Sequence, residues 1–172
     1  MREAIGSTWL IGIVITFIAI FSGFLAYSIS YTKAFRVKNE IINIIEKNEG
    51  FTSYNGGSYG SDTLMNMSDS DLQKETSTEA KAFRFIKSIG YDYAKFDSSS
   101  RVCEEGTLQT GGYCLVKYCP TNGETSRIYY KVTTYISLSI PIINVGVNLP
   151  ITGETKALYN DVGAFDCEGE RS

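Results

Sequence analysis

The sequence predicts an α+β protein in which a long N-terminal helix is followed by a small head, with one helix packed on an antiparallel β-sheet. Three observations predict this class. The segment Ala4–Thr32 contains no Asp, Glu, Lys or Arg. Apolar residues then continue at helical spacing through Lys33–Lys47, and apolar residues alternate with polar ones from Ile128 to Ile140. A helical period followed by a strand period places the helix first and the sheet last.

The first segment is long enough to cross a membrane. As a helix at about 1.5 Å per residue, Ala4–Thr32 would extend roughly 40 Å, more than the hydrocarbon core of a bilayer. A cleavable signal peptide has a shorter apolar core, of about 7–15 residues, behind a more basic start. A buried helix of a soluble core is the weaker alternative, because the segment is apolar on every face. We therefore predict a transmembrane anchor over 4–32.

The same helix is expected to continue as an amphipathic extension over 33–49, so that residues 1–49 form one N-terminal unit. No Gly or Pro occurs between Phe24 and Glu49, and Gly50 is a natural C′ residue. These limits predict a helix from about Thr8 to Asn48, roughly 60 Å long at 1.5 Å per residue. The apolar stripe of the second half, at steps of three and four, consists of Ala34, Val37, Ile41, Ile44 and Ile45.

Residues 50–76 are predicted to form a loop, because this segment is rich in Gly, Ser and Tyr and has no periodicity. Asp69 and Asp71 lack the other ligands of a calcium loop, so a solvated turn is expected there. The head, 77–172, begins with a helix whose expected N-cap is Ser77 and whose expected end is Gly90.

The rest of the head is predicted to be a meander of three to five strands. Segments 112–119 and 128–140 are the first two, and 143–149 follows after a turn at Pro141-Ile142. Pro150 is expected to end that strand, because proline cannot donate to a ladder. A last strand is expected over 153–159.

Four cysteines, Cys103, Cys114, Cys119 and Cys167, all follow the apolar segment. None forms a Cys-x-x-Cys pair, and an even count in a small anchored domain favours two disulfides and an extracytoplasmic head. Three pairings are possible, although Cys114 and Cys119 would point to opposite faces of one strand and should not bond each other. The alternative is four reduced cysteines in a cytosolic domain.

The charges beside the span favour the opposite orientation. Arg2 lies on one side, whereas Lys33, Arg36 and Lys38 lie on the other. The positive-inside rule alone would place the head inside the cell. The two signals disagree, and we give more weight to the cysteines.

Composition excludes several functions. The chain has 172 residues, no histidine and a net charge of −3. Catalysis by Ser-His-Asp or Cys-His sets and histidine metal sites are therefore excluded, and no basic field suggests nucleic acid. We found no catalytic set, phosphate loop or metal motif, so we expect no enzyme, no cofactor and no metal.

The sequence instead suggests association through the helix. Gly12/Thr16 and Ser22/Ala26 have the spacing of small residues that permits close helix contact in lipid. The residues expected to form an assembly helix are Glu3, Gly12, Thr16, Ser22, Ala26, Val37, Ile41 and Ile44. The expected partners are membrane lipid and further copies of the chain.

This layout is similar to that of type IV pilin-like proteins, and more closely resembles the TadE/TadF-like pseudopilins of tight-adherence (Flp-type) pilus systems. The resemblance rests on Gly6-Ser7 before the apolar segment, on its unbroken continuation to Gly50, and on the Tyr-rich C-terminal strand ending in 153–155. Where that family carries Glu-Phe, this chain has Thr8-Trp9-Leu10.

The resemblance implies a structural subunit or minor pseudopilin of a bacterial surface pilus or secretion apparatus, with no catalytic residues. It also implies other pilin-like subunits as alternative partners through the N-terminal helix, with Glu3 pairing with a neighbouring amino terminus. The alternative function is a monomeric, membrane-anchored extracellular binding domain, either an adhesin or a sensor ectodomain.

Overall fold

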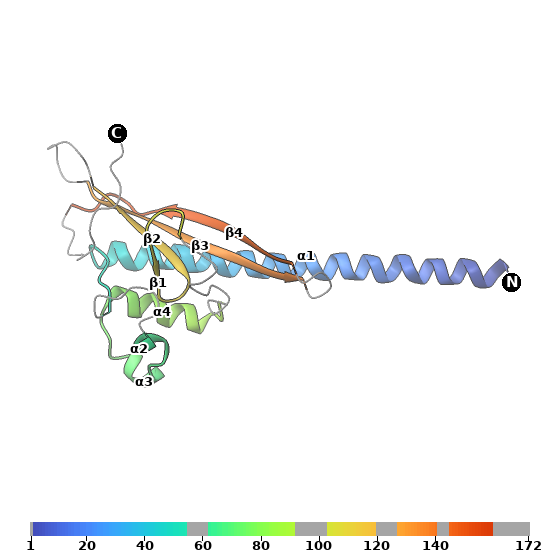
Figure 1. Cartoon of the computed structure of the whole chain (residues 1–172), viewed down its shortest axis with the longest axis horizontal. Helices are drawn as coiled ribbons and strands as arrows, with labels where there is room; N and C mark the ends of the chain where they lie inside the picture. Colours follow the sequence, from blue (N-terminus) through green and yellow to red (C-terminus); the bar gives the residue numbers. More distant parts are fainter. Residues whose placement is uncertain (1, 55–61, 92–102, 120–126, 141–144, 160–172) are drawn as a thin grey trace.

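The computed structural model describes residues 2–54, 62–91, 103–119, 127–140 and 145–159, and it describes side chains for these residues except 2–8 and 137–148. Helix α1 (Arg2–Lys47) projects far beyond a small head, in which short helices and an antiparallel sheet pack against its C-terminal half (Figure 1). The predicted α+β class with a long apolar N-terminal helix is thus confirmed.

The end of α1 differs in one detail from the prediction. The helix starts before Thr8 and ends at Lys47, and Glu49, not Gly50, takes the left-handed position, with φ 52°. The Gly50 N–H donates to the Ile45 carbonyl over 3.1 Å, the long-range bond of a Schellman cap with Glu49 at C′. A glutamate therefore occupies a backbone position that usually favours glycine.

Part of the segment predicted as a loop is helical. Two short helices, α2 (Asp62–Met65) and α3 (Asp69–Leu72), lie within 50–76. The prediction of a plain loop is wrong because Leu64 and Leu72 are buried in a small core with Ala80 and Phe83. Burial of these two leucines fixes turns that the local composition does not reveal.

Helix α4 (Thr78–Ser88) agrees with its prediction. The Ser77 side chain accepts a hydrogen bond from the Ala80 N–H, as expected of an N-cap. Gly90 has φ 62° and ends the helix in a Schellman motif, with the Tyr91 N–H donating to the Ile86 carbonyl over 3.2 Å.

The sheet is a four-stranded antiparallel meander in the order β1-β2-β3-β4. Its strands are β1 (Thr107–Gln109), β2 (Tyr113–Tyr118), β3 (Tyr129–Ile140) and β4 (Val145–Glu154). The predicted turn at 141–142 lies outside the described residues, although Ile140 pairs with Val145 on either side of it.

The sequence predicted that Pro150 ends a strand, and this prediction is wrong. Pro150 lies within β4. It pairs with Tyr135, whose N–H and C=O bond the Tyr91 hydroxyl and therefore point away from β4. In such a non-hydrogen-bonded pair the Pro150 nitrogen also points away from β3, to the open edge of the sheet, where no donor is needed. The last strand predicted at 153–159 is replaced by the end of β4 and an isolated bridge between Ile128 and Leu158.

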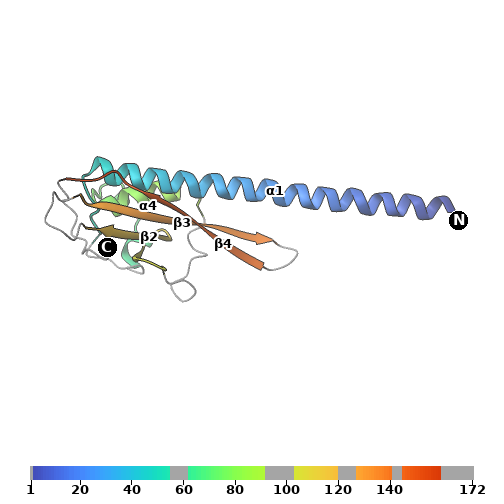
Figure 2. The ribbon, with the colours of Figure 1, turned by 90° about the horizontal axis from the view of Figure 1, so that it is seen from above.

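Helices α1 and α4 pack on one face of the sheet (Figure 2). The Thr134 hydroxyl of β3 donates to the Ala34 carbonyl of α1 over 3.1 Å. A Cβ at Gly153 of β4 would lie within 2.9 Å of Ile42, so that only glycine allows this close approach without rearrangement of α1 side chains. The second half of α1 is therefore a structural part of the head.

A buried carboxylate joins the parts of the head. Glu79 is only 1% exposed, and its two oxygens accept hydrogen bonds from the Tyr54 N–H (2.8 Å) and the Thr110 N–H (3.3 Å). Charge-assisted bonds of this kind are stronger than neutral ones. Glu79 thereby ties the segment after α1 and the β1–β2 turn to the start of α4.

Candidate functional site: the exposed half of helix α1

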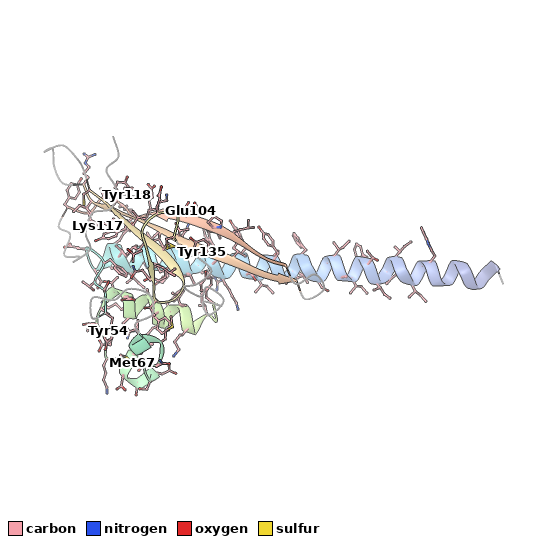
Figure 3. All side chains as sticks on the ribbon, in the orientation of Figure 1. Tyr54, Met67, Glu104, Lys117, Tyr118 and Tyr135 are labelled. Atoms are coloured by element: carbon pink, nitrogen blue, oxygen red, sulfur yellow. A yellow bond between two sulfur atoms is a disulfide. The ribbon has the colours of Figure 1, made fainter. Side chains whose placement is uncertain are left out.

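The candidate site is the apolar half of α1 that extends beyond the head. Every residue from Trp9 to Ala26 is exposed, and from Trp9 onward the first buried residue of the helix is Ala34. Trp9 is 75% exposed and Phe17 69%. Figure 3 shows the side chains of this half standing out from the helix with no other element against them. Among the described residues, α1 is the one helix long and apolar enough to cross a membrane.

Three hydroxyl groups in and beside this half are satisfied within the helix. Thr16 donates to the Gly12 carbonyl over 2.9 Å, Ser28 to Phe24 over 3.0 Å, and Thr32 to Ser28 over 2.8 Å. Such bonds to the carbonyl four residues earlier remove the need for a solvent partner. The helix can therefore present these residues to lipid or to another apolar helix without the cost of an unsatisfied donor.

Gly12 forms an open notch. An added Cβ would have no atom within 4 Å, so Gly12 serves no packing purpose within the chain. The notch is part of a shallow surface groove lined by Trp9, Gly12, Ile13, Thr16, Phe17 and Ile20. A second helix could approach closely here.

The small residues form a longer stripe than the two predicted pairs. Steps of three and four residues join Gly12, Thr16, Ala19, Gly23, Ala26 and Ser30. The same steps lead on to Ala34, Val37 and Ile41, which face the sheet. Sequence spacing alone could have found Ala19, Gly23 and Ser30, had the stripe been extended backwards from the amphipathic half.

Three residues predicted for assembly do not belong to this surface. Val37 and Ile41 are fully buried and Ile44 is 9% exposed, all within the core of the chain's own head. This corrects their assignment: their apolar stripe is already covered by the sheet and α4. Ser22 and Ala26 are exposed as expected, whereas the side chain of Glu3 lies outside the described part.

Aromatic and basic residues mark the point where α1 enters the head. Rings of Tyr27, Tyr31 and Phe35 succeed one another at centroid separations of 6.3 Å and 6.2 Å. Lys33 is the first charged residue after Glu3, and its Nζ donates to the Gly90 carbonyl over 3.1 Å. Tyrosine and lysine together are typical of a membrane–water boundary.

The length between boundaries fits a bilayer. Trp9 and Tyr31 are separated by about 33 Å of helix at 1.5 Å per residue, close to the roughly 30 Å of a hydrocarbon core. Beside Lys33, an open groove at the boundary is lined by Leu25, Ser28, Ile29, Thr32, Lys33, Arg36 and Ile89.

The head carries a disulfide on the sheet face opposite α1, since Cys114 pairs with Thr133, the neighbour of the α1-facing Thr134. Cys103 bonds Cys114 with a Cα–Cα distance of 5.8 Å, a pairing that the sequence had left open. Cys119 is also disulfide-bonded, and Cys167 lies outside the described residues. Nearby, Glu105 accepts from the Tyr118 hydroxyl at 2.7 Å.

The described part of the chain contains no group of three or more His, Cys, Asp or Glu side chains that could hold a metal ion. No protein-family model matches the sequence, and neither a curated protein nor a solved structure was found that matches it.

Proposed function

We propose that the chain is a pilin-like structural subunit, or a minor pseudopilin, of a bacterial surface pilus or secretion apparatus, and that it assembles through the exposed half of α1. One observation carries this proposal: every residue of α1 from Trp9 to Ala26 is exposed, while its second half is fixed in the head. A continuous apolar surface of this length needs either lipid or other apolar helices around it.

The small-residue stripe favours other helices as the final surroundings. Lipid is fluid and does not require a notch, whereas two helices approach more closely where Gly12 and Thr16 lie opposite a partner.

Shearing of cells followed by electron microscopy tests the proposal directly. Filaments that contain this chain support it, and a chain recovered as a monomer from gentle detergent contradicts it. The matched pair of variants is Gly12→Leu, which fills the notch, and Val14→Leu, which lies on the opposite side of α1. Leucine is a better helix former than glycine, so loss of assembly in Gly12→Leu cannot come from loss of helix.

A second function is favoured by the boundary around Tyr27–Lys33. A monomeric, membrane-anchored extracellular binding domain, either an adhesin or a sensor ectodomain, needs only the span and the head. Equal behaviour of Gly12→Leu and Val14→Leu, with no filament in either, would favour this function.

Both functions place the head outside the cytoplasm, and the disulfide Cys103–Cys114 supports that side. Labelling with a membrane-impermeant maleimide tests it. Cysteines that react from outside only after reduction agree with the proposal; free thiols that react only from the cytoplasm reverse the orientation.

A further inference from the structure

The outer part of the β3–β4 hairpin shares an unusual property with the exposed half of α1. No residue between Lys131 and Glu154 is charged, and these two residues lie opposite each other in the register of β3 and β4. The hairpin beyond this pair is therefore the second long charge-free segment of the chain, about a hundred residues after the first.

The fold brings the two charge-free segments to the same end of the head. Thr134 is fixed to Ala34 of α1, and Gly153 lies against Lys38 and Ile42. From these points the outer parts of β3 and β4 extend toward the N-terminal end of α1 (Figures 1 and 2), and in Figure 2 they are seen to diverge from it. Six residues of β3 beyond Thr134 span about 20 Å, the length of roughly 13 helical residues, so the hairpin extends past Lys33.

The register gives this part of the hairpin two unlike faces. Apolar residues pair with apolar residues: Ile136 with Leu149, Leu138 with Val147, and Ile140 with Val145. Small or polar residues pair on the other face: Ser137 with Asn148, and Ser139 with Gly146. Leu149 is 41% exposed. A two-stranded ribbon of this kind is marginally stable alone in water.

We propose that the outer β3–β4 hairpin enters the interfacial layer of the membrane that α1 crosses, so that the head contacts the bilayer at two places. The absence of charge removes the main cost of entry, and the apolar face gains from leaving water. This inference rests on the membrane insertion of α1 in the proposed function, but not on filament assembly.

The backbone limits how deep the hairpin can lie. β2 begins at Tyr113, and its pairing with β3 ends at Thr133, so the strand edges beyond Tyr135 have no neighbouring strand among the described residues. Open strand edges do not occur in the hydrocarbon core, where no water can bond them. The hairpin therefore lies at headgroup depth. Because its outer end reaches about residue 21 of α1, this depth requires α1 to be tilted in the bilayer, as membrane-spanning helices commonly are.

Depth-dependent fluorescence quenching tests this with the full chain in phosphatidylcholine vesicles that carry brominated acyl chains. Trp9 is the one tryptophan of the chain and reports insertion of α1. In a Trp9→Phe background, Leu138→Trp and, as a milder second probe, Leu149→Trp report the hairpin. Tyr159→Trp is the control, because Tyr159 is 69% exposed and follows β4 at its opposite end.

We expect both hairpin probes to lose fluorescence to bromines near the carbonyl groups more than to mid-chain bromines, and Tyr159→Trp to lose none. Quenching of Trp9 without quenching of either hairpin probe would overturn the inference while leaving the span intact. Failure of Trp9 quenching would instead overturn the span itself. The hairpin probes could instead be shielded from both bromines and aqueous iodide, and only at a high protein-to-lipid ratio. That result would show that a second copy of the chain covers this face, and it would also overturn the inference.

Discussion

The Tyr91→Phe variant tests how the head closes its sheet. The Tyr91 hydroxyl donates to the Tyr135 carbonyl over 2.6 Å and accepts from the Tyr135 N–H over 3.0 Å. The hydroxyl thereby bonds the edge of β3 at a position beyond Tyr113, where β2 begins and no longer provides a neighbouring strand. Both residues are only 6% exposed, so water cannot readily replace the hydroxyl.

The expected cost follows from these two bonds. Depriving a buried backbone donor or acceptor of its partner costs about 1–3 kcal/mol, and Tyr91→Phe does this at both the N–H and the C=O of Tyr135. We expect the free energy of unfolding to fall by about 2–4 kcal/mol. With a urea slope of about 2 kcal/mol per molar, the middle of the usual range, the midpoint should fall by about 1–2 M.

The assay is urea unfolding of the full chain in mild detergent, followed by circular dichroism. Tyr159→Phe is the control, since Tyr159 is 69% exposed and its hydroxyl should contribute less than about 0.5 kcal/mol. Amide hydrogen exchange at Tyr135 should also accelerate in Tyr91→Phe. Equal midpoints for Tyr91→Phe and Tyr159→Phe would refute the assigned role of the hydroxyl.

Three further predictions concern the head. Glu49→Gly should stabilise it by about 0.5–1 kcal/mol, because Glu49 has φ 52°; a lower urea midpoint would contradict the cap assignment. Burial, and secondarily the Glu79 charge, raises the pKa of Tyr113 well above its usual value, so this tyrosine stays neutral when folded. Stability should therefore fall as pH rises above about 10, where the unfolded tyrosine ionises, and Tyr113→Phe should weaken that fall without destabilising the protein at pH 7; an unchanged pH profile would refute this. Non-reducing peptide mapping should recover a Cys103–Cys114 link, and replacing both by serine should cost about 2–4 kcal/mol; any other partner for Cys103 would contradict the fold.

Some features of the fold depend on tertiary contacts that no local pattern contains. In the sequence Pro150 predicts the end of a strand, whereas in the fold β4 is an edge strand and the proline nitrogen faces outward. Leu64 and Leu72 lie in a segment of loop composition, yet their burial against α4 forms two short helices. Cysteine pairing likewise depends on which strands lie side by side.

The sequence by itself determined the features that arise from neighbouring residues: the unbroken apolar helix, the N-cap at Ser77, the stop at Gly90 and the alternation along β3. Helical and strand periods are local, so they survive without knowledge of the fold. Only the tertiary structure decided which part of the apolar stripe of α1 is available to other molecules. Val37 and Ile41 have the same spacing as Gly12 and Thr16, but the sheet covers the first pair and leaves the second exposed. A stripe specifies that something apolar must cover it, and the long-range packing of the chain decides what does.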